Sequence, residues 1–174
     1  MEIVNPACVV PWCYVDHRNS RTTCRTSGRG SASFLAGIDV SGNGQRHRRP
    51  GRGLVVSAER WFADRLGKPD EFAAFVVDDP VDGVICCAAG ICDSHAPTPK
   101  NLSGLHGTVF NVSTDSRHRR RGHARGCLTA LLSWFQDETE VQVVNLNATG
   151  DGIGLYESLG FVPPRFPALA IRLT

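Results

Sequence analysis

The sequence predicts an α+β protein with a mixed, mainly antiparallel sheet flanked by helices and an atypical N-terminal segment. Its 174 residues suffice for one domain with a real core but not for two full domains. From residue 54 onward, apolar runs alternate as helix, three strands, helix, strand, short helix and strand. Residues 16–53 are instead crowded with Arg, Ser, Gly and Thr, with Phe34 as their one aromatic residue. We therefore divide the chain into an atypical segment, 1–53, expected to be poorly ordered, and a domain over 54–174.

The composition is that of a water-soluble globular protein. Hydrophobic residues make up 41% and charged residues 21%, and the mean hydropathy is −0.15. The formal net charge of +2 is too small to imply a nucleic-acid or membrane partner by itself, and the excess of Arg lies in the first 60 residues. No apolar run is long enough to cross a bilayer, so we expect a cytoplasmic protein without a membrane partner.

The seven cysteines predict scattered free thiols rather than a disulfide framework. Four of them lie in apolar segments, where a reduced thiol packs as a small hydrophobe: Cys86, Cys87, Cys92 and Cys127. An N-terminal group could be considered as a zinc site: Cys8, Cys13, His17 and Cys24. Its Cys-x4-Cys spacing is not that of a zinc knuckle and no second knuckle follows, so we predict no metal.

The first half of the domain reads as one helix and three strands. Residues 57–66 favour a helix with Ser57 as its N-cap and Gly67 just past its end. The apolar runs 71–79 and 81–93 predict adjacent antiparallel strands joined by a turn at Asp82 and Gly83. A Pro-containing loop, 94–104, and a third strand, 106–115, follow.

The second half of the domain reads as a long helix, a strand, a short helix and a last strand. Leu128, Leu131, Leu132 and Phe135 share one face of a helix over about 123–137. We then expect a strand at 141–149, a short helix at 152–159 that is stopped by Gly160, and a last strand at 168–173.

The turn before the long helix carries the strongest functional signal. A helix start presents unpaired backbone N–H groups and the positive end of the helix dipole, which suits a phosphate or diphosphate. Gly122 and Ala124 leave the backbone open to close approach, and four arginines add positive charge: Arg119, Arg120, Arg121 and Arg125. Neither a P-loop nor a dinucleotide-binding glycine pattern is present. A solvated basic loop or a nucleic-acid patch is the alternative, although exposed aromatics are not interleaved with the arginines.

Two motifs resemble the GNAT N-acetyltransferases. Arg119, Gly122 and Ala124 match the family's Arg/Gln-x-x-Gly-x-Gly/Ala acetyl-CoA signature, and Tyr156, Gly160 and Phe161 match its C-terminal Tyr-x-x-x-Gly-Phe element. They occur in the family's order, and residues 111–115 resemble the lead-in of a bacterial subgroup. The resemblance covers about 57–174.

The resemblance implies transfer of an acetyl group from acetyl-CoA to a primary amine of a small molecule or peptide. It also implies that the strand 106–115 splays from the strand 141–149 and that the pantetheine arm inserts between them. The residues that would hold the cofactor are Val112 and Thr114 by their backbone, Arg119, Arg121, Gly122, His123, Ala124 and Arg125 around the diphosphate, and Asn147 at the strand end. Asn147 could equally cap a turn.

Tyr156 is the candidate general acid, since a phenol can protonate the sulfur of the departing CoA thiolate. Its alternative role is that of a core aromatic on a short helix. The amine must first lose a proton, and we favour Asp93 as the base over Asp115, His95 and His123.

Residues 16–53 depart from the resemblance, because no amphipathic helix is visible before residue 57. Their composition resembles an out-of-frame translation of a GC-rich gene, which sequencing of the coding DNA would test. Three functions stay open: an active N-acetyltransferase, a CoA-binding module without turnover, and a basic nucleic-acid-binding protein. We keep a homodimer as a candidate assembly.

Overall fold

The computed structural model describes residues 13–14 and 52–173, with the side chains of 13–14, 52–55 and Glu59 outside the description. The expectations for the N-terminal segment lie outside the description: Cys8, His17 and Cys24 of the considered zinc ligands, the side chain of Cys13, and the residues of the out-of-frame hypothesis. The division of the chain at residue 54 therefore stays a prediction. None of the described helices is long and apolar enough to cross a membrane.

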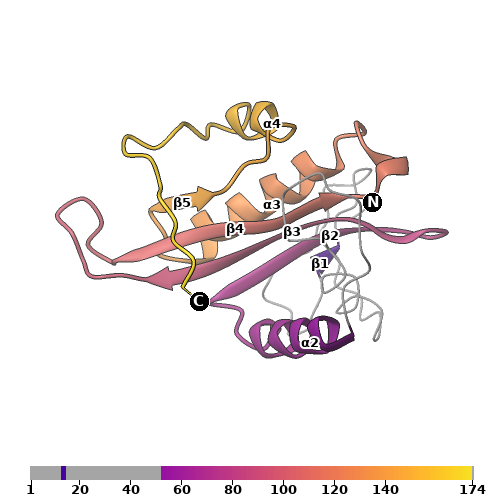
Figure 1. The fold of residues 1–174 in the computed structure, drawn as a ribbon, viewed down its shortest axis with the longest axis horizontal. Helices are drawn as coiled ribbons and strands as arrows, with labels where there is room; N and C mark the ends of the chain where they lie inside the picture. Colours follow the sequence, from indigo (N-terminus) through magenta and orange to yellow (C-terminus); the bar gives the residue numbers. More distant parts are fainter. Residues whose placement is uncertain (1–12, 15–51, 174) are drawn as a thin grey trace.

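One mixed sheet forms the centre of the protein (Figure 1). Its strands, in spatial order, are β1 (Cys13–Tyr14), β2 (Phe72–Asp79), β3 (Gly83–Ser94), β4 (Leu105–Thr114) and β5 (Val143–Leu146). The long pairs β2–β3 and β3–β4 are antiparallel, whereas the short pairs β1–β2 and β4–β5 are parallel. The predicted mixed, mainly antiparallel sheet is thus confirmed.

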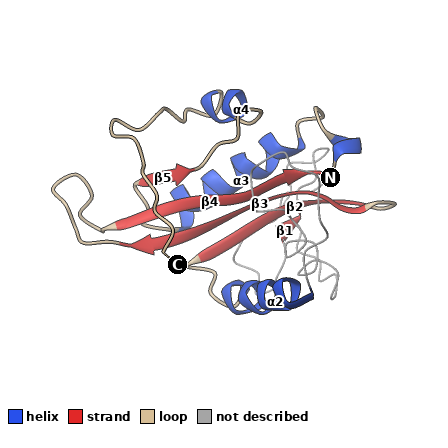
Figure 2. Ribbon diagram, in the orientation of Figure 1, coloured by secondary structure: helices blue, strands red, loops and turns tan. Residues whose placement is uncertain are grey.

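The two long helices cover opposite faces of the sheet, as Figure 2 shows for α2 (Arg52–Leu66) and α3 (His123–Glu138). Alternate residues of β2 explain this arrangement, because Phe75 and Val77 pack in the cluster under α3 while Phe72 and Val76 pack in the cluster under α2. A strand that is buried on both faces is apolar at every position, and residues 72–77 of β2 have this pattern before the strand ends in two aspartates.

Two glycines let α3 approach the sheet closely. A Cβ on Gly90 would lie 2.7 Å from Cζ of Phe135, and one on Gly107 would lie 2.8 Å from its Cε1. Real Cβ atoms do not come this close to a neighbour, so the Phe135 ring occupies the space that side chains on β3 and β4 would need.

Helix α2 begins earlier than predicted. It starts at Arg52, so Ser57 lies inside the helix and is not its N-cap. A serine in a helix interior costs only about 0.5 kcal/mol relative to alanine. The helix can therefore continue through Ser57, and the serine does not mark its start. The predicted end at Leu66 is confirmed, and Lys68 N donates to Arg65 O beyond it.

The predicted strand 168–173 is wrong. Residues 161–173 have no helix or strand, and Leu169, Ile171 and Leu173 are 95%, 85% and 89% exposed. Apolar alternation makes a strand only where a neighbouring strand accepts its hydrogen bonds, and this segment pairs with no strand of the described structure. The strand expected at 141–149 is also shorter, because β5 ends at Leu146.

Candidate functional site

Strands β4 and β5 separate halfway along β4. They pair from His106–Val143 to Val109–Leu146, and β5 then ends while β4 continues to Thr114. Residues 110–114 therefore have a β5-side edge without a strand partner in the described part of the chain. Val112 and Thr114 lie on this stretch, and the exposed Asn147 directly follows β5 at the opening. These are the positions that the resemblance implied for them.

A bulge in β4 lies where the strands separate. Asn111 has a φ of +50°, and the β3–β4 register shifts between Cys87 and Ala89. Cys87 Sγ donates to the carbonyl of Asn111 at 2.9 Å. The Asn111 Oδ1 atom is buried and has no hydrogen-bond partner among the described residues. Such a bulge re-aims the backbone next to a site.

Sequence reasoning did not assign a role to Asn111. The only local signal is its residue type, because Asn adopts the left-handed region more readily than other residues with a side chain. Nothing in the sequence says which Asn does so.

The start of α3 has the open backbone that the sequence predicted. Gly122 is its N-cap with a φ of +83° and no side-chain cap, and a Cβ placed on Gly122 would have no neighbour within 4 Å. The first helical bond runs from Gly126 N to Gly122 O at 3.0 Å. The N–H groups of Ala124 and Arg125 make no hydrogen bond to any described group, so they can receive an anion.

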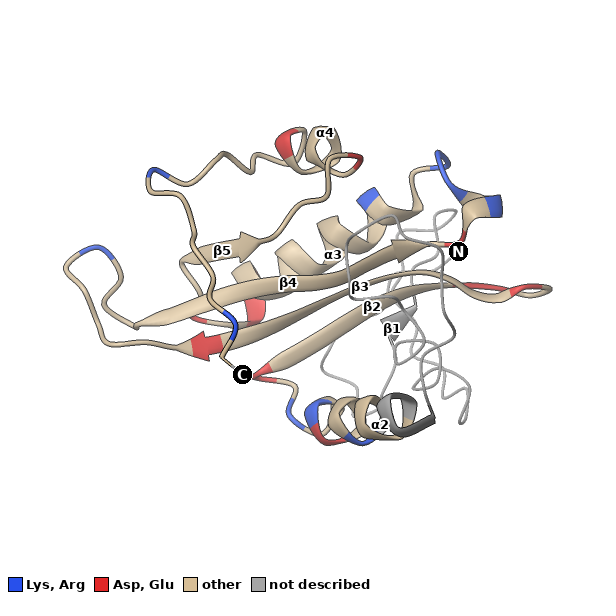
Figure 3. Ribbon diagram, viewed as in Figure 1, with Lys and Arg blue, Asp and Glu red and all other residues tan. Residues whose placement is uncertain are grey.

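All four arginines of this turn are exposed, and two of them, Arg119 and Arg125, also donate hydrogen bonds to other parts of the protein. Arg119, Arg120 and Arg121 are exposed, and Figure 3 shows the basic residues gathered between β4 and α3. Arg119 Nε donates to the carbonyl of Thr114 at 3.2 Å, whereas Arg125 Nη2 donates to Ser158 Oγ at 2.7 Å. The second bond ties the start of α3 to the end of α4 (Ile153–Glu157).

Tyr156 lies on α4 and is half-buried against the core under α3. Its ring contacts Phe161 edge to face at 6.0 Å between centroids. Burial raises the pKa of its phenol, because the phenolate would lose hydration. Within residues 52–173 its hydroxyl makes no hydrogen bond, so the neutral O–H is available as a donor. Both roles considered from the sequence, packing and proton donation, are compatible with this placement.

Asp93 lies at the other end of the sheet. Its Oδ2 accepts a hydrogen bond from Thr108 Oγ1 at 2.8 Å, and its strand partner is His106. Thr108 precedes Asn111 by three residues, or about 10 Å of strand. The structure therefore does not bring Asp93 into the opening between β4 and β5, and its role as the base stays a prediction.

Two other candidates for the base have different surroundings. Asp115 is paired with Arg117, whose side chain lowers the pKa of the carboxyl to about 2. It is therefore a weak proton acceptor at neutral pH. The imidazole of His123 is buried at the first residue of α3, so it does not line the surface of the turn.

Comparison with known proteins identifies the family. Residues 45–161 match the profile of the Acetyltransferase (GNAT) family. A comparison with curated proteins found no match.

Solved structures show the same fold. A predicted acetyltransferase from Clostridium acetobutylicum, crystallised with acetyl-CoA, is 20% identical over 80% of this chain and 88% of its own, with a TM-score of 0.67. A GCN5-related N-acetyltransferase from Ralstonia eutropha is 18% identical over 81% and 90% of the two chains, with a TM-score of 0.63. Glucosamine-6-phosphate N-acetyltransferase from Arabidopsis thaliana is 15% identical over 81% and 92%, with a TM-score of 0.62. The family profile spans well over half of this chain, which therefore belongs to the GNAT acetyltransferase family.

Proposed function

We propose that the protein transfers an acetyl group from acetyl-CoA to the primary amine of a small molecule or peptide. Family membership makes it an acetyltransferase, and acetyl-CoA is the co-substrate that this membership and the Clostridium neighbour indicate. Two observations carry the proposal: β4 and β5 separate after the Val109–Leu146 pair, and the start of α3 has no side-chain cap.

The residues of the turn fit the diphosphate of the co-substrate. Gly122 adopts a left-handed conformation with open space at its Cβ position, and the Ala124 and Arg125 N–H groups lack partners among the described groups. A fixed positive dipole end next to exposed arginines favours a doubly charged anion. The proposed set is the one inferred from the sequence: Val112, Thr114, Arg119, Arg121, Gly122, His123, Ala124, Arg125 and Asn147.

Acetyl-CoA would supply the activated acetyl group, and this chain would supply positioning and a proton. The Tyr156 phenol is protonated at neutral pH, burial raises its pKa further, and its Oη can donate a proton to the departing sulfur. Asp93 remains the proposed base for the incoming amine, with the distance from the opening as the argument against it. A base that takes the proton of the acceptor amine directly must lie within one hydrogen bond, or one bridging water, of that amine.

The acceptor, the location and the assembly state are also proposals. The acceptor is an amine of a small molecule or a peptide, as in the sugar phosphate named for the Arabidopsis neighbour and the ribosomal-protein alanine named for a neighbour from Brucella melitensis. We also keep the cytoplasmic location and the homodimer as predictions.

An amine panel with thiol detection tests the proposed activity. The expected result is release of free CoA that depends on both acetyl-CoA and one class of amine. Binding of acetyl-CoA without CoA release by any amine would instead support a non-catalytic CoA-binding module. Affinity for nucleic acid that falls steeply with salt and does not compete with CoA would support the third function.

A further inference from the structure

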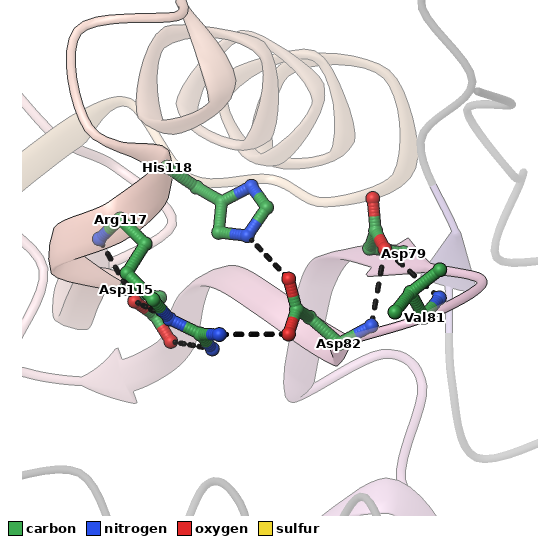
Figure 4. Close-up of polar contacts among 6 residues, drawn as sticks. All are labelled: Asp79, Val81, Asp82, Asp115, Arg117 and His118. Carbon is green, nitrogen blue, oxygen red and sulfur yellow. Dashed lines mark hydrogen bonds and ion pairs between the residues drawn. The ribbon is translucent and has the colours of Figure 1, made fainter.

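The β2–β3 hairpin makes a side-chain contact with the turn that leads to the proposed diphosphate site. Asp82 Oδ1 lies 2.8 Å from Arg117 Nη1, and Asp82 Oδ2 lies 2.9 Å from His118 Nε2 (Figure 4). Arg117 and His118 belong to the short 3₁₀ helix η1 (Ser116–His118), directly before Arg119. One carboxylate therefore holds two consecutive residues of this helix.

The hairpin presents Asp82 in a fixed position. Asp79 Oδ1 accepts hydrogen bonds from the N–H groups of Val81 at 2.9 Å and Asp82 at 3.1 Å. Gly83 then reverses the chain with a φ of +71°. A carboxylate on a turn that is closed by its own hydrogen bonds loses little freedom when it pairs.

A second carboxylate holds the same arginine from the other side. Asp115 Oδ2 lies 2.8 Å from Arg117 Nη2, and Asp115 Oδ1 accepts from Arg117 N at 2.9 Å. The Asp115 N–H donates to the carbonyl of Ile85 at 2.8 Å, which fixes η1 to β3. Asp82 is ionised at neutral pH, and its hydrogen bonds from His118 and Arg117 lower its pKa further.

The segment that follows η1 needs such support. Arg120 has a φ of +61°, in a region that residues with a side chain seldom adopt, and Gly122 has a φ of +83°. Strained backbone persists where its surroundings hold it in place. Within 116–122, His118 is buried while its neighbours are exposed, so it is the anchor of this turn in the part of the chain that is described.

We propose that Asp82 is a positioning residue for the co-substrate: through His118 and Arg117 it holds residues 119–122 in the conformation that receives the diphosphate. This inference rests on the proposed function. Asp82 touches neither the co-substrate nor the reacting atoms, and its effect should be confined to donors that carry the diphosphate.

The test compares Asp82→Asn with a matched control, Asp64→Asn, which removes the carboxylate of an exposed ion pair between α2 and Lys68 just beyond its end. The dissociation constant for CoA is measured by calorimetry, and turnover is measured with acetyl-CoA and with S-acetylpantetheine, which lacks the diphosphate. For Asp82→Asn we expect about tenfold weaker CoA binding and a higher KM for acetyl-CoA with little change in kcat. We expect unchanged kinetics with S-acetylpantetheine, and wild-type values for Asp64→Asn throughout.

A double-mutant cycle with His118→Gln tests the proposed route. If Asp82 acts through His118, the Asp82→Asn effect on CoA binding shrinks in the His118→Gln background. Should Asp82→Asn fail to fold, Arg117→Gln at the same ion pair replaces it, since Arg117 is exposed.

The outcomes are distinguishable. Equal CoA binding by the wild type and Asp82→Asn overturns the inference alone, and so does an equal loss with S-acetylpantetheine. Failure of the wild type to bind CoA overturns the proposed function and the inference with it.

Discussion

At the scale of single residues, Tyr156 carries the proposed chemistry. Replacing it with Phe keeps the ring that contacts Phe161 and removes only the acidic proton. We expect kcat to fall by about 100-fold, the lower end of the rate enhancement that a general acid usually provides. The dissociation constant for acetyl-CoA should stay the same. Steady-state kinetics with calorimetry would check this, and full activity of Tyr156→Phe would remove the phenol from the mechanism.

Gly122 tests the phosphate turn at the same scale. A valine there would meet the positive φ of +83° and place a branched side chain where the diphosphate is proposed to lie. We expect the dissociation constant of Gly122→Val for acetyl-CoA to rise at least about tenfold, the equivalent of about 1.4 kcal/mol. Gly150→Val is the control, because that position is also open but lacks a positive φ. Unchanged affinity in Gly122→Val would count against the turn as a phosphate site.

At the scale of elements, the close packing of α3 on the sheet depends on Gly107. An alanine there would lie 2.8 Å from Phe135 Cε1 and 2.9 Å from its Cζ, so the buried ring must shift. We expect Gly107→Ala to lower the free energy of unfolding by about 1–3 kcal/mol, measured by denaturant titration. Gly154→Ala in α4 is the matched control, because no atom lies within 4 Å of its added Cβ. Equal stability of the two variants would contradict this account of the packing.

The junction between the β2–β3 hairpin and η1 predicts sensitivity to acid. Hydrogen bonds and ion pairs lower the pKa of Asp79, Asp82 and Asp115, the last to about 2 from an ordinary value of 3.8. Between pH 3.8 and about pH 2, the unfolded chain binds more protons than the folded one, so the free energy of unfolding falls as the pH drops. The stabilisation is present above pH 3.8 and is lost as the pH falls toward 2.

Removal of one of these groups checks the assignment. Asp115→Asn should show a flatter decline of unfolding free energy between pH 4 and pH 2 than the wild type, and lower stability at neutral pH. An unchanged slope in this variant would show that Asp115 titrates normally in the folded protein.

At the scale of the whole molecule, co-substrate binding should stabilise the fold. A ligand that binds only the native state at a free concentration of 100 times its dissociation constant adds about 2.7 kcal/mol. For a protein of this length we expect the thermal midpoint to rise by about 5–10 °C. Differential scanning fluorimetry with acetyl-CoA and with adenosine as the control would measure it, and no shift with acetyl-CoA would argue against a site for this ligand.

Much of the order of elements could be predicted from local pattern. The sequence predicts the long helix at 123–137, and it spans His123–Glu138, because its apolar spacing and its glycine turn are properties of adjacent residues. The predicted last strand, 168–173, is wrong because its apolar residues have a strand pattern but lie beside no strand of the described structure. The backbone hydrogen bonds of a strand need a partner strand, whereas those of a helix join residues of the same segment.

The sequence alone determined the residues that bear the chemistry of the proposed site: the arginine-rich turn, Gly122 at the helix start and Tyr156 before Gly160. Only the tertiary structure decided how they are held. Three features depend on residues that are far apart in the chain: the bulge at Asn111, the separation of β4 from β5, and the contacts of Asp82 with Arg117 and His118. The reason is physical: capping and helical spacing act between neighbours, whereas a bulge register or an ion pair across 35 residues exists only after the sheet has assembled.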